Sequence, residues 1–101
     1  MTDELASKLK KEIDVAEWDL LRPHLQRDAL IYVAPELNLV DVGVKVANDD
    51  LTEINRLLDH GMLTKPTTSQ LEEWEKRPKT EFIFLILQPY VLFQPKPDLS
   101  S

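Results

Sequence analysis

The sequence predicts an α+β domain: a small, mostly antiparallel sheet of four strands with helices packed on one of its faces, in the order α-α-β-β-α-β-α-β. Three observations favour this fold class. The chain has 101 residues, the length of one domain. Hydrophobic residues make up 43% of it, which is enough to form a core. Apolar residues recur at helical spacing in some segments and alternate as in a strand in others. We expect a single domain over residues 1–94 and a disordered tail over residues 95–101.

The N-terminal segment predicts two helices. Over residues 4–12 the apolar side chains recur every fourth position and form one stripe, as on a helix. Residues 14–17 (Asp-Val-Ala-Glu) have the spacing of a capping box, so a second helix carrying Trp18 is expected to begin there. Pro23 must kink that helix or start a new turn, because proline has no N–H to donate.

The next segment predicts an antiparallel hairpin. Residues 29–33 are a short apolar run rich in strand formers, and in residues 39–46 four valines alternate with other residues, as in a half-buried strand. Between them, Pro35 fixes φ and Asn38 tolerates a left-handed conformation, which favours a turn. This connection is too short for a parallel crossover, so the two strands should pair antiparallel.

The following segment predicts two helices separated by a short strand. Residues 50–53 and residues 67–70 both have the pattern of a capping box, so each should begin a helix. Gly61 should end the first of these helices, because glycine favours the position just after a helix C-terminus. Residues 62–65 are expected to form the short strand.

The last segment predicts the most apolar strand of the chain. Residues 81–87 are almost continuously apolar, which indicates a strand covered on both faces. Pro89 interrupts the hydrogen-bond ladder and predicts a bulge, a bend or an unpaired stretch, after which residues 90–94 are extended again. The pattern does not specify the order of the strands in the sheet.

Several short motifs together carry a family resemblance. They are residues 32–42 (YVAPELNLVDV), the pair Asp49-Asp50, Gly61 with Lys65-Pro66-Thr67, Trp74, and residues 88–92 (QPYVL). In this order and spacing the chain resembles a bacterial family of small proteins labelled domain of unknown function 2288, over nearly everything from Leu5 to Gln94. The resemblance implies a stand-alone cytoplasmic bacterial protein, and it supplies no catalytic residues.

The charge of the chain argues against several classes of protein. There are 18 acidic and 12 basic side chains, a net charge of −6, and the acidic excess is spread evenly over the two halves. Without clustered lysine and arginine, binding to nucleic acid is not expected. The N-terminus lacks the apolar stretch of a signal peptide and no apolar run is long enough to span a bilayer, so we expect a cytoplasmic protein without a membrane partner. With no cysteine there is no disulfide or zinc–thiolate site.

Three carboxylates form one candidate site. Asp49, Asp50 and Glu53 fall at the expected junction of a strand and a helix, and oxygen ligands of this kind bind divalent cations. The alternative, which we favour, is that they cap the helix and complement its dipole. No catalytic residue and no cofactor are predicted.

Aromatic and amide side chains form a second candidate site. They are Trp18, Trp74, Gln88, Tyr90 and Gln94. The two tryptophans could line a pocket, although tryptophan at helical spacing more often belongs to the core. Irregular strands such as the one at Pro89 often lie beside binding sites, and the alternative is a bend that protects a sheet edge.

These features favour a non-enzymatic protein-interaction or regulatory module. A protein partner or a second copy would bind through residues 90–93, which we expect at a sheet edge. A second hypothesis is a small-ligand-binding protein with a pocket between the helices and the sheet, lined by Trp18, Trp74 and Tyr90. A third is a metal-assisted hydrolase built on the three carboxylates.

Overall fold

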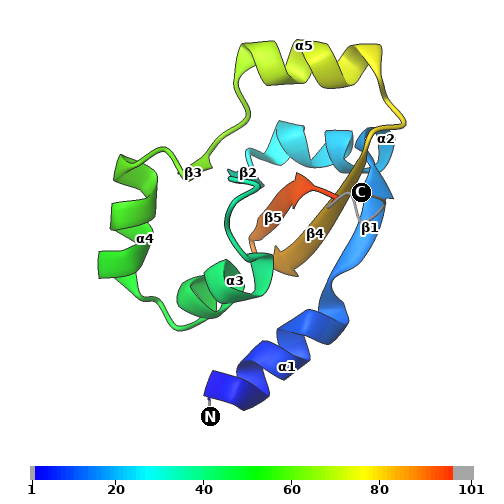
Figure 1. Cartoon of the computed structure of the whole chain (residues 1–101). Coiled ribbons are helices and arrows are strands. Elements are labelled where there is room, and N and C mark those ends of the chain that lie inside the picture. The colour runs from blue at the N-terminus through cyan, green and yellow to red at the C-terminus, as the bar shows by residue number, and fades with distance from the viewer. Residues whose placement is uncertain (1, 97–101) are drawn as a thin grey trace.

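The centre of the molecule is a five-stranded mixed sheet with the strand order β1-β4-β5-β2-β3 (Figure 1). The structure, a computed structural model, describes residues 2–96. The strands are β1 (Asp14–Glu17), β2 (Leu30–Val33), β3 (Leu63–Thr64), β4 (Glu81–Leu87) and β5 (Tyr90–Pro95). Neighbouring strands are antiparallel except for β2 and β5, which are parallel. The α+β class is therefore confirmed, whereas the predicted number of strands was one too few.

Helices cover both faces of this sheet, not one as predicted. They are α1 (Thr2–Glu12), α2 (Trp18–Leu21), α3 (Leu39–Ala47), α4 (Leu51–Asp59) and α5 (Thr68–Lys76), with a 3-10 helix η1 (Arg22–Arg27) after α2. Side chains of α1, α3 and α4 pack on one face and those of α2, η1 and α5 on the other. None of the helices in the described part of the chain combines the length and the apolar character needed to cross a membrane.

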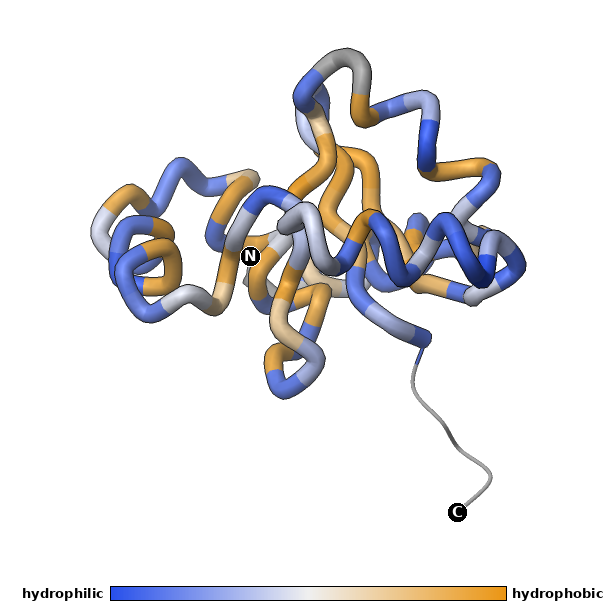
Figure 2. Tube along the Cα trace, turned by 90° about the horizontal axis from the view of Figure 1, so that it is seen from above, coloured by the Kyte–Doolittle hydropathy of each residue, from blue (hydrophilic) through white to orange (hydrophobic). Residues whose placement is uncertain are grey.

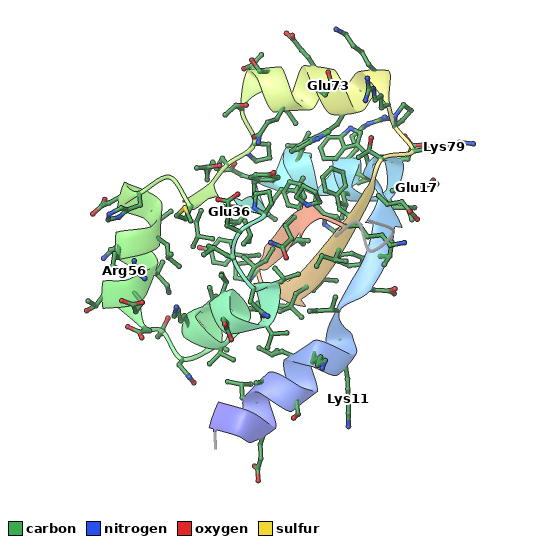
Figure 3. All side chains as sticks on the ribbon, viewed as in Figure 1. Lys11, Glu17, Glu36, Arg56, Glu73 and Lys79 are labelled. Atoms are coloured by element: carbon green, nitrogen blue, oxygen red, sulfur yellow. The ribbon has the colours of Figure 1, made fainter. Side chains whose placement is uncertain are left out.

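The two faces of the sheet carry two different hydrophobic cores. Along β4, Phe82 belongs to one core and Leu85 to the other, as the alternation of side chains in a strand requires, and both are fully buried. The leucine core consists of Leu9, Val33, Leu39, Val42, Leu57, Leu63, Leu85 and Leu92. The aromatic core consists of Ala16, Trp18, Leu21, Leu30, Trp74, Phe82, Val91 and Phe93, and Figure 3 shows its rings gathered between α5 and the sheet. Because β4 contributes to both, the prediction that it is covered on both faces is confirmed.

The predicted hairpin over residues 29–46 was wrong, because its second strand is helix α3. Asn38 is extended rather than left-handed and caps this helix. Its side-chain oxygen accepts hydrogen bonds from the backbone N–H groups of Val40 (2.9 Å) and Asp41 (3.2 Å). These bonds satisfy two of the donors that a helix start leaves without a partner, and they fix where the helix begins.

The alternating valines of α3 conceal a helical stripe. Leu39, Val42 and Gly43 stand at helical spacing, and all three are buried on the sheet. At Gly43 the helix comes so close to the sheet that a Cβ atom would lie 2.6 Å from Leu85 Cδ2 and 3.2 Å from Leu9 Cδ1. Packing against β4 therefore favours the helix where local alternation favours a strand.

The prediction that a helix begins within residues 14–17 was also wrong. These residues form β1 and pair with β4, and the backbone N–H of Trp18 continues the ladder by donating to the carbonyl of Thr80 at 3.0 Å. The capping-box pattern of residues 14–17 therefore does not begin a helix here, because pairing with the distant strand β4 outweighs the local preference for a helix. The helix starts only at Trp18, and Pro23 is the second residue of the new turn, η1, that was expected there.

The starts of α4 and α5 agree with the predictions. Thr67 and Gln70 form a complete capping box, with each side chain bonded to the other residue's backbone N–H. Asp50 accepts a hydrogen bond from the backbone N–H of Glu53 at 3.3 Å. Gly61, with φ +70°, follows the end of α4, where only glycine adopts a left-handed conformation without strain.

The C-terminal strand β5 is not at a sheet edge, contrary to the prediction for residues 90–93. It lies between β4, which it meets in a hairpin, and β2. Gln88 and Pro89 form the turn of this hairpin, joined by a cis peptide bond, and Pro95 is the last residue of the strand. Lys96 follows the strand, and its backbone N–H donates to the carbonyl of Glu81 at 3.2 Å, whereas residues 97–101 of the predicted tail lie outside the described residues. The edges of the sheet are β1 and β3.

Candidate functional site

A groove of about 570 Å³ lies between helix α4 and the sheet. We call it the α4 groove. Its described lining comes from α3, α4, β2, β3 and β5, together with three loops: those that precede β2 and α4, and the one that follows β3. The lining is apolar except for three charged residues, Asp28, Asp49 and Lys65, and the hydroxyl of Tyr90.

Helix α4 forms one wall of the groove. Leu51, Ile54 and Leu58 line it, whereas Leu57 is directed into the leucine core and is 3% exposed. In Figure 2, where α4 lies at the left, its trace alternates between hydrophobic and hydrophilic residues. A single short helix thus presents apolar side chains in two directions, one toward the core and one toward the groove.

The floor of the groove is the edge of the leucine core. Ile31 and Leu92 are register partners on the parallel strands β2 and β5, and Leu63 of β3 continues the same surface. Leu92 and Leu63 are buried, and Tyr90 lies at the start of β5, where its side chain reaches solvent. The groove therefore has a rigid floor on the sheet and an open rim.

Exposed apolar side chains are concentrated at this rim. Six large apolar residues are exposed in the described part of the chain, and three of them line the groove: Leu51 (64% exposed), Leu58 (48%) and Tyr90 (45%). Exposed apolar side chains gathered in one place are typical of binding sites on soluble proteins, because a complex that buries them removes their apolar surface from water.

The charged residues of the groove lie at its margins. Lys65 forms an ion pair with Asp28, the residue that ends η1. Asp49 lies in the loop between α3 and α4. Asp28 and Asp49 both have positive φ, 54° and 56°, a conformation that aspartate tolerates better than most residues.

The three carboxylates of the first candidate site have separate environments. Asp49 lines the groove, Asp50 caps α4, and both oxygens of Glu53 accept hydrogen bonds from Arg56 (2.9 and 3.1 Å). These hydrogen bonds, with the charges of Arg56 and Lys45, lower the pKa of the Glu53 carboxyl below its ordinary value. Among the side chains that the structure describes, no group of three or more His, Asp or Glu is placed to hold a metal ion.

The two tryptophans of the second candidate site lie in the aromatic core. Trp18 is fully buried, Trp74 is 8% exposed, and their ring centroids are 5.0 Å apart. The indole N–H of Trp18 donates to Glu75 of α5 at 2.6 Å, so its one polar group is satisfied at the edge of the core. Tyr32 completes this aromatic cluster, and burial, with a smaller contribution from the charge of Glu36, raises the pKa of its hydroxyl.

The other three residues of that candidate site are separated from the tryptophans. Gln94 is 4% exposed and donates hydrogen bonds to the carbonyls of Ala34 and Leu37, both at 3.1 Å. Gln88 is exposed in the β4–β5 turn, and Tyr90 lines the α4 groove. Of the five residues, the structure thus brings only Tyr90 to this groove.

The groove-lining face of α4 was missed in the sequence, although a signal for it exists. At about 100° per residue, Leu51, Ile54 and Leu58 fall within about 60° of one another on a helical wheel. Leu57 lies about 60–120° to one side of them. The four side chains together span about 120°, the ordinary width of a single apolar stripe, so the spacing shows a broad apolar face but does not by itself separate its groove side from its core side.

Fold and groove together define a small α+β protein with a single mixed sheet between two helical layers and an apolar groove on one of them. The chain belongs to the family described as Protein of unknown function (DUF2288), whose family model matches residues 4–95. The resemblance seen in the sequence motifs is therefore confirmed.

One solved structure is similar to this chain over nearly its whole length. It is the NMR solution structure of PA1075 from Pseudomonas aeruginosa, with a TM-score of 0.78 and 28% sequence identity. The similarity covers 97% of this chain and 90% of that one. No curated protein matches the sequence.

Proposed function

We propose that this protein is a protein-interaction module that binds its partner through the α4 groove. The observation that carries the proposal is the convergence of Leu51, Leu58 and Tyr90, half of the exposed large apolar residues described, on one groove. The net charge of −6 also supports a protein rather than a nucleic acid as partner. We further propose a cytoplasmic location, which the family resemblance suggests.

The exposed rim would contribute substantially to such an interface. Complete burial of a leucine side chain is worth about 1.5–3 kcal/mol, and Leu51 and Leu58 have roughly half or more of their surface still to bury. Each would therefore contribute about 1–2 kcal/mol, which corresponds to about a tenfold change in affinity.

A small-ligand-binding protein is the second candidate. The groove lies between helices and sheet, and its volume falls within the range of about 300–1,000 Å³ that is typical of small-molecule sites. The exposed side chains of the rim favour the protein partner, because a small ligand would leave much of Leu51 in water.

The test is affinity capture from a lysate of the cells that produce the protein, with two matched variants. Leu58→Ser removes an apolar side chain from the groove, and Leu20→Ser removes a leucine of α2 that lies outside it and is still more exposed (68% against 48%). A protein that binds the unaltered chain and Leu20→Ser, but at least about tenfold less to Leu58→Ser, supports the proposal. Equal capture by all three contradicts it.

A thermal-shift screen distinguishes the small-ligand-binding protein from the protein-interaction module. A small apolar compound at about 100 times its Kd should stabilise the unaltered chain by about 2.7 kcal/mol. If a compound does so and Leu58→Ser loses the effect, while no protein is captured, the second candidate replaces the first.

A further inference from the structure

We propose that the segment of the partner that occupies the α4 groove is a short amphipathic helix with basic residues on its exposed face. This inference rests on the function proposed above and specifies the chemistry of the partner. Three observations carry it: the composition of the groove walls, the spacing of the apolar residues on α4, and the distribution of charge around α3 and α4.

The walls of the groove favour a helix over an extended peptide. They consist mostly of apolar side chains from α4 and the sheet, so an extended segment lying in the groove would bury many of its backbone N–H and C=O groups without partners. The nearby sheet edge offers little backbone pairing, because β3 has two residues and Pro66 follows soon after it. A helix satisfies its backbone groups internally and can present apolar side chains alone.

The dimensions of α4 match two turns of such a helix. Leu51 and Leu58, the outer apolar residues of this wall, are separated by seven positions, about 10 Å along the helix axis. An incoming helix laid alongside α4 would cover this distance with apolar residues at positions i, i+4 and i+7. Ile54, between the two leucines, continues the contact surface.

Charge around the groove selects a basic partner. Residues 41–60 contain five carboxylates and two basic side chains, Lys45 and Arg56, which is half of the net charge of the whole chain. Both basic side chains are paired with Glu53, and Lys65 in the groove is paired with Asp28. The remaining carboxylates, among them Asp49 in the groove lining, give this surface a negative field, which attracts lysine and arginine.

The test uses synthetic peptides of about 14 residues as defined probes. The first has leucine at positions i, i+4, i+7 and i+11 and lysine at most of the others. The second has glutamate in place of lysine, and the third has the composition of the first with the leucines distributed around the helix. Binding of the labelled peptides to the full chain is followed by fluorescence anisotropy at about 50 mM and about 300 mM salt.

We expect the lysine–leucine peptide to bind saturably, and the other two peptides to bind at least about tenfold more weakly. Leu58→Ser should weaken binding at least about tenfold, and Leu20→Ser should leave it unchanged. Asp49→Asn, which keeps a residue tolerant of positive φ, should weaken binding about two- to fivefold at low salt and less at high salt. Glu72→Gln, an exposed carboxylate of α5, should have no such effect.

Other outcomes overturn the inference in distinguishable ways. Equal binding of the lysine–leucine peptide to the unaltered chain and to Leu58→Ser shows a general attraction of charges and refutes the groove as its site. If the glutamate peptide binds as well as the lysine peptide, the basic partner is refuted. If no peptide binds, although capture of a partner protein still depends on Leu58, the helical partner is refuted while the interaction module stands.

Discussion

Replacement of Gly43 by alanine tests how closely α3 approaches the sheet. In most helix interiors, glycine to alanine stabilises by about 1 kcal/mol, because alanine has less backbone freedom to lose. Here the new methyl group would lie 2.6 Å from Leu85 Cδ2, far inside the ordinary contact distance of about 3.5–4.0 Å. Leu85 is fully buried and has no solvent to move into, so overpacking should cost about 1–3 kcal/mol. We expect a net loss of about 0–2 kcal/mol in the free energy of unfolding.

A double-mutant cycle with Leu85 separates the two contributions. Leu85→Ala alone should lower the free energy of unfolding by about 2–5 kcal/mol, within the stability of about 5–15 kcal/mol usual for a domain. In that background the clash at 2.6 Å is gone, so Gly43→Ala should stabilise by up to about 1 kcal/mol. The coupling between the two sites should therefore be about 1–3 kcal/mol.

Urea unfolding followed by circular dichroism measures all four proteins of the cycle. Equal m-values would show that the comparison concerns stability and not a change in the unfolded state. The reasoning is refuted if Gly43→Ala stabilises the unaltered protein by about 1 kcal/mol and the two effects are additive. That result would mean that α3 lies farther from β4 than the structure shows.

Three further predictions concern polar groups at the two cores. Because the pKa of Tyr32 is raised in the folded protein, its contribution to stability is complete below the ordinary value of 10.0 and is lost as pH rises beyond that value. Tyr32→Phe should remove this alkaline loss in urea unfolding between about pH 8 and pH 11, and an unchanged loss would contradict the assignment. Glu75→Ala leaves the indole N–H of Trp18 without its acceptor and should lower Tm by about 4–8 °C in a calorimetric scan, whereas Glu75→Gln keeps an acceptor and should lower it less. Gln94→Leu removes the donors to two backbone carbonyls and should lower the free energy of unfolding by about 1–3 kcal/mol, so a neutral result in urea titration would contradict the role of this amide.

The elements predicted correctly are those whose signals are local. The capping box of Thr67 and Gln70 and the glycine at position 61 act within a few residues, and both operate as expected. The almost continuously apolar run of β4 also identified a strand covered on both faces, because both layers of helices bury it. Signals of this kind depend little on which distant segment packs against them.

The elements predicted wrongly are those decided by distant contacts. Residues 14–17 form a strand because β4, more than sixty residues later, provides the ladder. The valines of α3 alternate as in a strand, and although Asn38 supplies a local cap, the close packing of Gly43 on Leu85, more than forty residues later, is the contact that the sequence pattern does not encode. The central position of β5 follows from its parallel pairing with β2, which no local pattern encodes.

The candidate sites show the same division. Tyr90 was a candidate and lines the groove, but Trp18 and Trp74 meet each other in the aromatic core. The local apolar spacing around each tryptophan predicted that it lies on a helix. Which side chains the two tryptophans contact depends on how the helices pack on the sheet, and the sequence pattern does not specify that. The groove itself needs α3 and α4 on the same face of the sheet, which could not be foreseen while residues 39–46 were expected to form a strand.

The central place of β5 has a consequence for the synthesis of the protein. This strand leaves the ribosome after every other strand, yet it joins β4 to the pair formed by β2 and β3. Until it emerges, the nascent chain can form its helices and local turns but not the continuous sheet, and both cores lack their middle row of side chains. The sheet can therefore form only after residue 95 has emerged from the ribosome, and until then the apolar strand β4 has no partner on its β5 side.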